Sequence, residues 1–456
     1  MPPLGPRLIV AGTSSGVGKT TVATGLMTAF RRRGATVASA KVGPDFIDPG
    51  YHALATGRPG RNLDPWMCGA ETVGPLAARE AAGADLLVVE GVMGLFDGAA
   101  GEPGLAPVAS TAQVAALLDA PVVLVVDASA MSGSVAALVH GFTTFSPAVR
   151  VAGVVLNRVG SDSHEEMLRR ALEPLGVPVL GALRRDDALV WRERHLGLVP
   201  VVEAPGAVVA ALDRVAHAVE RGCDLDRLLA LASTAPDVSV GAPPQARRKA
   251  SARVAVLGGR AFAFTYPDNL EVLEQAGAEL VPVDPEADRR VPEGTAALYA
   301  GGGFPEVFAA GLAANRPLLD DVRRRVAAGL VTWAECGGLL WLTRSLDGHP
   351  MAGAVAAQAH MTPRLTLGYR RARTAVETPL GAPGTALRGH EFHYSAVEPG
   401  GGALRWQGRE GEGRGGFASP TLLASYLHVH LASDPPLAER FVGASARAAR
   451  QAGADG

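Results

Sequence analysis

A glycine-rich segment near the start of the chain has the residue types that hold nucleotide phosphates. Residues 10–23 read VAGTSSGVGKTTVA, which follows a strand-like run and opens a helical pattern. In that position, backbone N–H groups and the helix N-terminus face the phosphates. The loop is one residue longer than the common phosphate-loop pattern. We expect a nucleotide site made of Thr13, Ser14, Ser15, Gly16, Val17, Gly18, Lys19, Thr20 and Thr21.

Three residues near this loop have separate expected roles. Lys19 can reach the β- and γ-phosphate oxygens, and the hydroxyl of Thr20 can ligate Mg²⁺. Asn157 closes a later strand-like run, VAGVVLN, and is a candidate for contact with the nucleotide base. A structural role in a turn is the competing interpretation of Asn157.

Carboxylates that would complete a magnesium–nucleotide site follow two further strand-like runs. Mg²⁺ prefers hard oxygen ligands and retains several waters. Because the carboxyl ends of parallel strands meet at one edge of a sheet, we expect the metal ligands to be Thr20, Asp45 and Glu90. Singly, such residues are more often caps or turn residues. The residues expected to position the reacting carboxylate or phosphoryl group are Lys41, Asp48 and Asp97.

A second set of residues that could do chemistry lies in the last third of the chain. Cys336, in VTWAECGGLLWL, stands between a strand-like run and a helical pattern. Its small neighbours allow a strained elbow that exposes a nucleophile, and a helix N-terminus lowers a thiol pKa. His428, in SYLHVHLAS, could serve as the base of such a cysteine. The alternative is a metal pair with His430, but no third ligand of suitable spacing lies nearby.

Backbone N–H groups near this cysteine could stabilise an oxyanion. The run LYAGGGFPE ends a strand in three glycines, which leave the backbone accessible. We expect the oxyanion donors to be Gly302, Gly303 and Gly337.

The elements that must position these residues alternate between buried strands and helices. In the first half, near-continuous apolar runs lie at 7–12, 36–43, 85–92, 121–128 and 151–159. Such runs suit a parallel sheet that is covered on both faces. Helical patterns that end at glycine separate them. This order predicts a doubly wound α/β fold, a parallel-sheet P-loop NTPase domain.

A stretch rich in proline and basic residues divides the chain. With 456 residues, two domains are the natural expectation. The sequence APDVSVGAPPQARRKAS has no periodicity and reads as a linker. Strand and helix patterns then resume. We place the nucleotide-binding domain at 1–236, the linker at 237–251, a second α/β domain at 252–445 and a flexible tail at 446–456.

Composition excludes several classes of protein. The net charge is -2, which gives no electrostatic reason to expect nucleic acid or a membrane surface as a partner. No apolar run is long enough to span a bilayer, and the first residues lack the layout of a secretory signal. We therefore expect a cytoplasmic protein. The cysteines Cys68, Cys223 and Cys336 lie too far apart for a disulfide framework or a zinc site.

The second α/β domain resembles the glutaminase domain of class I glutamine amidotransferases. These domains hydrolyse glutamine through a cysteine thioester and release ammonia. The resemblance implies that Cys336 is the nucleophile and that His428 is its base. Many members have a glutamate two residues after this histidine, where the present chain has His430. This departure matches a subgroup that works with a Cys–His pair, and the motif does not give the residue that orients His428.

From Arg7 to about Ser433, the chain resembles the cobyrinic and hydrogenobyrinic acid a,c-diamide synthases, and its first half also resembles dethiobiotin synthetase. The matching motifs are AGTSSGVGKT, KVGPDFIDPGYH, GRPGRNLDPW, EGVMGLFDG, AFAFTYPDNL, GGGFPE, ECGG, LTLGYR, GHEFHYS and SYLHVH. The resemblance implies a ligase of cobalamin biosynthesis that uses ATP with Mg²⁺ and takes nitrogen from glutamine. Its substrate would be a corrin-type polycarboxylate, whose a and c acetates are amidated through acyl phosphates. The resemblance leaves a homodimer open.

Two alternatives remain at this stage. Similar machinery could amidate nickel-sirohydrochlorin, a related ring. From another class, the chain could be a partitioning or metal-insertion ATPase whose second domain serves only for binding. As candidates for pairing with the carboxylates of a ring substrate, we note Arg58, Arg61 and Arg364.

Overall fold

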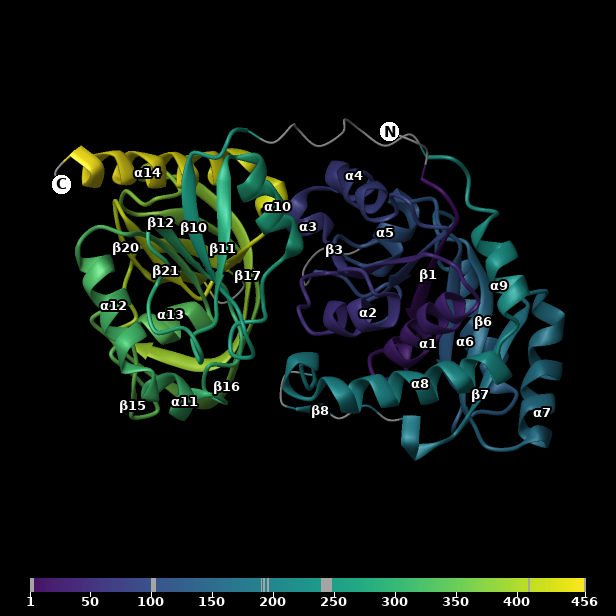
Figure 1. Cartoon of the computed structure of the whole chain (residues 1–456). Helices are drawn as coiled ribbons and strands as arrows, with labels where there is room; N and C mark the ends of the chain where they lie inside the picture. Colours follow the sequence, from purple (N-terminus) through teal and green to yellow (C-terminus); the bar gives the residue numbers. More distant parts are fainter. Residues whose placement is uncertain are drawn as a thin grey trace. The chain divides into compact units, whose positions relative to one another are not determined.

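The chain forms two compact units, Met1–Pro243 and Pro244–Gly456 (Figure 1). The computed structural model describes residues 4–99, 104–189, 191, 193–194, 197–238, 248–408 and 411–454. Most of the expected linker at 237–251 therefore lies outside the described residues, as do the last two residues of the expected tail. In the part of the chain that is described, no helix is both long and apolar enough to cross a membrane.

Within the described residues, the first unit is built on a seven-stranded parallel sheet of order β3-β2-β4-β1-β5-β6-β7. Its strands are β1 (Arg7–Gly12), β2 (Val37–Val42), β3 (Arg61–Leu63), β4 (Leu86–Glu90), β5 (Val122–Asp127), β6 (Val151–Val159) and β7 (Val179–Arg184). The apolar runs of the sequence predict five of these strands to within one or two residues at each end. Because β4 and β5 flank β1, the winding reverses at β1, and ligands of such sheets bind at the carboxyl ends of the strands at this point.

Helices cover both faces of this sheet, and α8 packs along α1. A Cβ at Gly25 would lie 2.5 Å from Val219, so the two helices approach closely at this glycine. The helices are α1 (Lys19–Arg32), α2 (Asp48–Thr56), α3 (Pro65–Cys68), α4 (Ala70–Glu80), α5 (Thr111–Leu117), α6 (Ser134–Thr144), α7 (Asp162–Leu172), α8 (Pro205–Gly222) and α9 (Leu225–Ala232). Shorter elements are β8 (Glu193–Arg194), β9 (Gly197–Leu198), η1 (Glu173–Leu175), η2 (Asp187–Leu189) and η3 (Val201–Glu203).

The second unit has a central sheet of order β11-β10-β12-β13-β21-β20, parallel except for β20. Its strands are β10 (Ala252–Leu257), β11 (Ala278–Val283), β12 (Thr295–Ala300), β13 (Val331–Glu335), β20 (Phe417–Ser419) and β21 (Leu422–Ser425). The helices are α10 (Pro267–Gln275), α11 (Ala309–Ala314), α12 (Arg316–Ala327), α13 (Gly337–Leu342) and α14 (Pro435–Ala454), with the short turn η4 (Leu431–Ser433).

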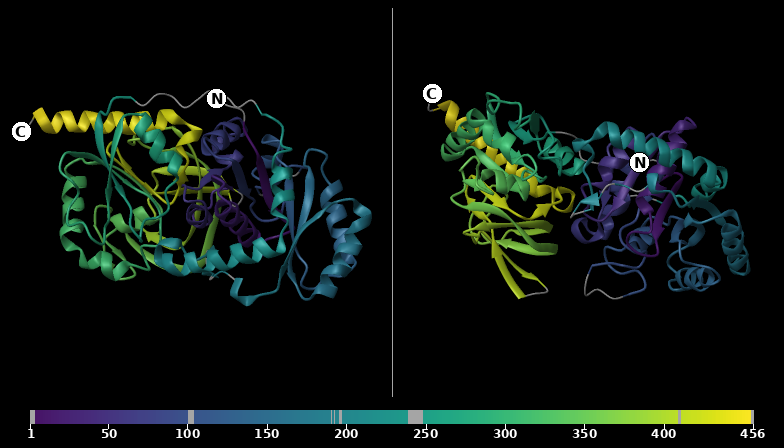
Figure 2. Two further views of the ribbon diagram at one scale, coloured as in Figure 1. Left: turned by 45° about the vertical axis from the view of Figure 1, so that its right-hand side comes forward. Right: turned by 90° about the horizontal axis from the view of Figure 1, so that it is seen from below.

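A second, mostly antiparallel sheet in this unit is not predicted by the sequence patterns. Figure 2 shows its long strands in green to yellow. Its order is β15-β14-β16-β17-β22, with β18 paired to β16 and β19 paired to β18. The strands are β14 (Ser345–Leu346), β15 (His349–Pro350), β16 (Gln358–Thr374), β17 (Ala386–Glu398), β18 (Leu404–Gly408), β19 (Gly411–Gly415) and β22 (His428–Val429).

Two apolar cores cover the central sheet of the second unit. Leu319 and Val322 of α12 and Leu340 of α13 belong to one core, and Leu437 and Phe441 of α14 belong to the other. The sequence predicts that the domain ends at residue 445 and that a flexible tail follows. The structure instead continues α14 to Ala454 (Figure 1). The residues after 445 read ARAARQAGA, and alanine and arginine have high intrinsic helix propensity.

Candidate active sites

The segment after β1 wraps around the amino group of Lys19. Gly16 and Gly18 have φ angles of 76° and 98°, the left-handed region that glycine adopts without strain. Helix α1 begins at Lys19, whose Nζ donates to the carbonyl of Ser14 at 2.9 Å. Burial and the nearby charge of Lys41 together lower the pKa of Lys19 to about 8, against the opposing effect of Glu90. The loop thus has the strand–loop–helix geometry that its sequence predicts, with a cation inside it.

Asn157, at the carboxyl end of β6, holds this loop in place. Its Nδ2 donates to the carbonyl of Val17 at 2.9 Å, and a Cβ at Gly18 would lie 2.1 Å from the same Nδ2. Its neighbour Arg158 donates to the carbonyl of Gly16 at 2.9 Å. The structure therefore gives Asn157 a contact with the loop backbone, and its contact with a nucleotide base stays a prediction. The sequence patterns did not single out Arg158.

Behind the loop lies a buried cluster of charges centred on Glu90. The carboxylate of Glu90 is fully buried, and its Oε1 accepts from the hydroxyl of Thr20 at 2.6 Å and from Nζ of Lys41 at 2.9 Å. Its Oε2 lies 2.6 Å from Nε2 of His52. Lys41 also pairs with Asp48 at 2.6 Å. The structure thus brings together four residues that the sequence predicts for this site, and adds His52.

In this cluster Lys41 and Glu90 stabilise each other's charged form, whereas the charged form of Asp48 is disfavoured. Burial alone raises the pKa of Glu90, but Lys41 and the hydrogen bonds from His52 and Thr20 outweigh it and hold that pKa below its usual range. For Lys41, burial lowers the pKa, whereas Asp48 and Glu90 raise it by more. Burial raises the pKa of Asp48 well above its usual range, and Asp45 raises it further. Lys41 is therefore held as a cation between its two acidic partners.

The oxygen donors here fit a hard divalent cation that also binds nucleotide phosphates. The Thr20 hydroxyl gives its proton to Glu90 and keeps its lone pairs for a ligand. Asp45 is half-buried, and its Oδ1 accepts from the N–H of Ile47 at 2.7 Å. Among the described residues, no group of three or more His, Cys, Asp or Glu side chains could hold a metal ion. Such a cation would therefore depend on phosphate oxygens for part of its coordination.

The loop after β4 packs against the phosphate loop. The N–H of Leu95 donates to the carbonyl of Gly12 at 2.8 Å, and Oδ2 of Asp97 accepts from the N–H of Gly94 at 2.8 Å. Asp97 is exposed beside the site, and its role in positioning a substrate stays a prediction. Arg58 does not match the expectation for it, because its guanidinium donates to the backbone carbonyls of Glu80 and Ala82. Arg61 is buried and donates to the Glu80 carboxylate at 3.3 Å.

In the second unit, Cys336 has the backbone conformation of a nucleophile elbow. It stands between β13 and α13 with φ 46° and ψ -103°, which a residue with a side chain rarely adopts. A Cβ at Gly338 would lie 2.2 Å from the carbonyl oxygen of Ala300, and one at Gly337 would lie 2.9 Å from the amide nitrogen of Gly303. The two glycines are therefore needed for the close packing of the elbow.

The protonation state of Cys336 differs from what the sequence predicts. Burial raises the pKa of the Cys336 thiol, Glu306 raises it further, and the N–H of Gly337 only partly offsets these effects. Burial of the sulfur therefore outweighs the N–H groups at the start of α13, which the sequence predicts to lower this pKa. Burial also holds the pKa of His428 well below its usual range. The resting pair is therefore a neutral thiol and a neutral imidazole.

The prediction that the N–H of Gly302 stabilises an oxyanion is wrong. The N–H of Gly302 donates to the carbonyl of Phe264 at 2.9 Å, in an isolated β-bridge, and is engaged there. Gly302 instead allows close approach, since a Cβ at this position would lie 2.4 Å from Cε1 of His428. The amides of Gly303 and Gly337 remain the expected donors.

Two motifs without an assigned role pack around His428. The ring of His390 stacks on that of His428, with centroids 4.9 Å apart, and its Nε2 lies 2.9 Å from the hydroxyl of Tyr266. Tyr266 also lies against His430, whose Nε2 is 3.5 Å from Oδ2 of Asp268. Burial lowers the pKa of His390 to about 3, so this neighbour is uncharged. The motifs AFAFTYPDNL and GHEFHYS thus support the histidine segment.

The packing at Gly338 gives a first testable prediction. We expect Gly338→Ala to displace the elbow and to destabilise the second unit by about 1–3 kcal/mol, the usual cost of overpacking. Thermal unfolding and the rate of Cys336 alkylation by iodoacetamide measure the two effects. Gly258→Ala is the matched control, since its Cβ would meet nothing nearer than 4.0 Å. Unchanged values for Gly338→Ala would contradict the packing that the structure shows.

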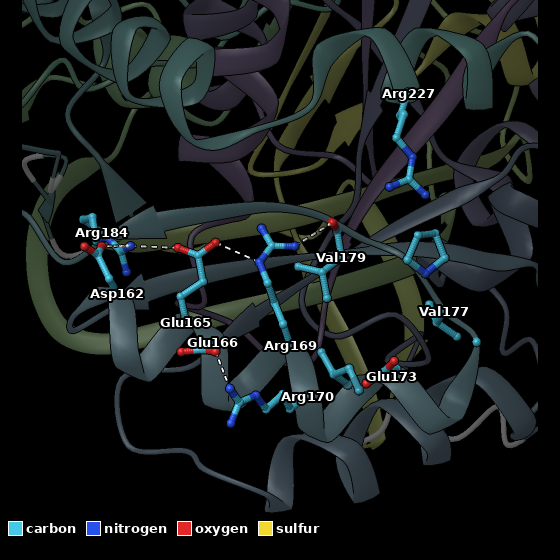
Figure 3. Close-up of a pocket in the computed structure, with 13 residues that line it drawn as sticks. Asp162, Glu165, Glu166, Arg169, Arg170, Glu173, Val177, Val179, Arg184 and Arg227 are labelled. Carbon is cyan, nitrogen blue, oxygen red and sulfur yellow. Dashed lines mark hydrogen bonds and ion pairs between the residues drawn. The ribbon is translucent and has the colours of Figure 1, made fainter.

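A surface hollow of about 880 Å³ in the first unit belongs to neither site. Figure 3 shows the charged side chains along α7 that line it. Glu165 pairs with Arg169 at 2.8 Å and with Arg184 at 2.8 Å, and these side chains are partly exposed. Exposed pairs of this kind contribute little to stability. Because its charges neutralise one another, we assign no ligand to this hollow.

Comparisons with known proteins match both units of the chain to known domains. A model of the CobQ/CobB/MinD/ParA nucleotide binding domain matches residues 8–198, and a model of the CobB/CobQ-like glutamine amidotransferase domain matches residues 253–436. These two domains define the class: an amide-forming ligase that takes its nitrogen from glutamine. The fold class predicted from the sequence is confirmed.

Full-length relatives narrow this class. A hydrogenobyrinate a,c-diamide synthase of Streptomyces coelicolor is 51% identical, over 96% of this chain and 97% of that protein. One of Thermobifida fusca is 48% identical, over 96% of each. A cobyrinate a,c-diamide synthase of Synechococcus sp. is 42% identical, over 97% of this chain and 98% of that protein. The chain belongs to the hydrogenobyrinate and cobyrinate a,c-diamide synthase family, which confirms the resemblance stated from its motifs.

Proposed function

We propose that the chain amidates the a and c acetate carboxylates of hydrogenobyrinic acid with ATP and glutamine. The observation that carries the proposal is the presence of a nucleotide-binding domain and a glutamine amidotransferase domain on one chain that aligns over 96% of its length with hydrogenobyrinate a,c-diamide synthases. The named hydrogenobyrinate synthases are 48–51% identical, whereas the cobyrinate synthases are 40–44% identical. This difference favours the metal-free ring over the cobalt ring.

The first unit would activate the carboxylate. A carboxylate does not react with ammonia because hydroxide is a poor leaving group, and transfer of the γ-phosphoryl group from ATP to the acid gives an acyl phosphate. Lys19 would neutralise charge on the transferring group, while the Lys41–Asp48–Glu90 cluster fixes Thr20 beside it. The residues that would hold Mg²⁺, which supplies further charge neutralisation when bound, are Thr20, Asp45 and Glu90.

The second unit would supply ammonia. The Cys336 thiol gives its proton to His428, and the sulfur attacks the side-chain carbonyl of glutamine. The amides of Gly303 and Gly337 stabilise the oxyanion. As it collapses, His428 returns the proton to the leaving nitrogen, which departs as ammonia and leaves a thioester that water hydrolyses. Ammonia then displaces phosphate from the acyl phosphate. Two rounds give the diamide.

Mass spectrometry of the ring product tests this function. Hydrogenobyrinic acid, cobyrinic acid and nickel-sirohydrochlorin are each supplied with Mg-ATP and glutamine. We expect two amidations, fastest on hydrogenobyrinic acid. Amidation of nickel-sirohydrochlorin alone would overturn the ring assignment, and no amidation of any ring with ATP hydrolysis intact would support the ATPase alternative. A homodimer stays a prediction, which sedimentation of the purified protein checks.

A further inference from the structure

We infer that Glu335, the residue directly before Cys336, positions His428 as the base for the thiol. The inference rests on one part of the proposed function, the hydrolysis of glutamine by the second unit. A catalytic histidine needs a partner that fixes its ring and its tautomer, and carboxylates commonly fill that role. The chain has His430 where many amidotransferases have such a carboxylate, so the partner must come from elsewhere.

Glu335 contacts the histidine segment at two points. Its side chain is buried at the end of β13, and Oε2 lies 3.9 Å from Nδ1 of His428. Its Oε1 accepts from the N–H of Val429 at 2.8 Å. The separation of 3.9 Å is longer than a hydrogen bond, and such catalytic contacts commonly tighten when substrate binds. One carboxylate thus holds the backbone next to His428 and lies on the Nδ1 side of its ring.

A buried network fixes Glu335 in this position. The hydroxyl of Tyr299 donates to Oε2 of Glu335 at 3.0 Å. Asn269 donates to the carbonyl of Val429 at 2.7 Å and accepts from the N–H of Leu431 at 2.7 Å. Asn269 also donates to the Tyr299 hydroxyl at 3.2 Å. The backbone from 428 to 431 is therefore held from two sides, which leaves His428 little freedom to rotate away.

The orientation of the ring sets the tautomer. A Cβ at Gly302 would lie 2.4 Å from Cε1 and 3.2 Å from Nε2 of His428, so this edge faces the glycine loop on which the Cys336 elbow packs. An ionised Glu335 favours the proton on Nδ1 and leaves the lone pair on Nε2. The thiol proton moves to Nε2, the sulfur becomes a thiolate, and the ring becomes an imidazolium. Glu335 takes no proton and stabilises that positive charge.

The role requires the carboxylate to be ionised, which makes it depend on pH. Burial raises the pKa of Glu335 to about 8, and the bonds from Val429 and Tyr299 oppose this rise. The titratable groups that face it are Tyr299 from β12, His428 from β22 and its chain neighbour Cys336. The ionised fraction of Glu335 therefore grows as the pH rises through about 8. We expect kcat for glutamine hydrolysis to grow over the same range.

Glutamine hydrolysis by Glu335→Gln tests the inference. We expect kcat to fall by about 10²-fold or more, with the KM for glutamine little changed, because the variant loses general-base efficiency and not a glutamine contact. The rise of kcat near pH 8 should disappear. Glu335→Asp keeps the charge and should recover at least about ten-fold of the loss, since such a charge accounts for much of the effect of a histidine partner.

Tyr299→Phe is the matched control, since it removes one bond to Glu335 and keeps the carboxylate. We expect a loss of kcat below about ten-fold, because the carboxylate and its bond from Val429 remain. The pH dependence should be retained and shifted upward, because the Tyr299 bond lowers the pKa of Glu335. A double-mutant cycle completes the test. In a protein that already carries His428→Ala, adding Glu335→Gln should lower kcat for glutamine hydrolysis no further.

Two outcomes would overturn the role. The first is an equal loss of kcat in Glu335→Gln and Tyr299→Phe, with the pH dependence of kcat intact in both. The second is a full additional loss of kcat when Glu335→Gln is added to His428→Ala. Thermal unfolding checks each variant. If Glu335→Gln is unfolded, the pH profiles of Glu335→Asp and Tyr299→Phe decide instead. Because glutamine hydrolysis is measured without any ring, failure of this inference is distinct from failure of the ring assignment.

Discussion

Cys336→Ala is expected to lower glutamine-dependent amidation by about 10³-fold or more, because no other group can take the place of the sulfur nucleophile. Amidation supplied with free ammonia should persist, since the first unit makes the acyl phosphate with its own residues. The elbow should survive the change, because alanine is smaller than cysteine at a site whose close contacts come from Gly337 and Gly338. Product formation with glutamine and with ammonium chloride, measured on one preparation, checks the expected loss of glutamine-dependent amidation and the expected retention of ammonia-dependent amidation.

Cys223→Ala is the control for this experiment. Cys223 lies in the first unit at the end of α8, where its sulfur packs against Gly181, and it belongs to neither site. We expect both activities to stay at the level of the unsubstituted protein. Retained glutamine-dependent activity in Cys336→Ala would contradict the assignment of the nucleophile. Loss of the ammonia-dependent activity as well would contradict the independence of the two chemistries.

The sequence predicts the parallel sheets well because their strands are buried on both faces. Strands β1 and β6 match the apolar runs at both ends, since a continuous run of buried residues leaves a clear signal. The hairpin of β16 and β17 leaves no such signal in the sequence. Strand β16 is mostly exposed or half-buried and carries the charged run RRAR. Strand β17 alternates, but several of its buried positions are polar, among them His390, Glu391 and His393. The backbone ladder between the two strands holds them together, and a ladder cannot be read from residue types.

Some residues of the candidate sites can also be predicted from the sequence, whereas others cannot. Lys19 and Cys336 stand in local motifs whose geometry follows from neighbouring residues, so their positions are predictable. His52 meets Glu90 across 38 positions, and Glu335 meets Val429 across 94. These partners depend on which strands lie side by side. The sequence predicts that the N–H of Gly302 is available to an oxyanion. In the structure it donates to the carbonyl of Phe264, a residue distant in the sequence.

Lys19→Met is expected to abolish ligation with both glutamine and ammonia, by about 10³-fold, while glutamine hydrolysis without nucleotide continues. Methionine has a similar length and no charge, so it fills the loop and removes only the cation that would neutralise the transferring phosphoryl group. Lys41 cannot replace it, because its amino group is already paired with Asp48 and Glu90.

The lysines of the chain are Lys19, Lys41 and Lys249, and the last is exposed, so Lys249→Met is the matched control and should keep full activity. Burial lowers the pKa of Lys19 to about 8, so the unliganded amino group loses its charge as the pH rises past that value. Bound phosphates favour the charged form and raise this pKa. Nucleotide affinity of the unsubstituted protein should therefore weaken above about pH 8, whereas that of Lys19→Met should be low and insensitive to pH. Titration calorimetry with Mg-ATP at pH 7 and pH 9 measures both, and a Lys19→Met variant that ligates ammonia at the normal rate would contradict the role of this lysine.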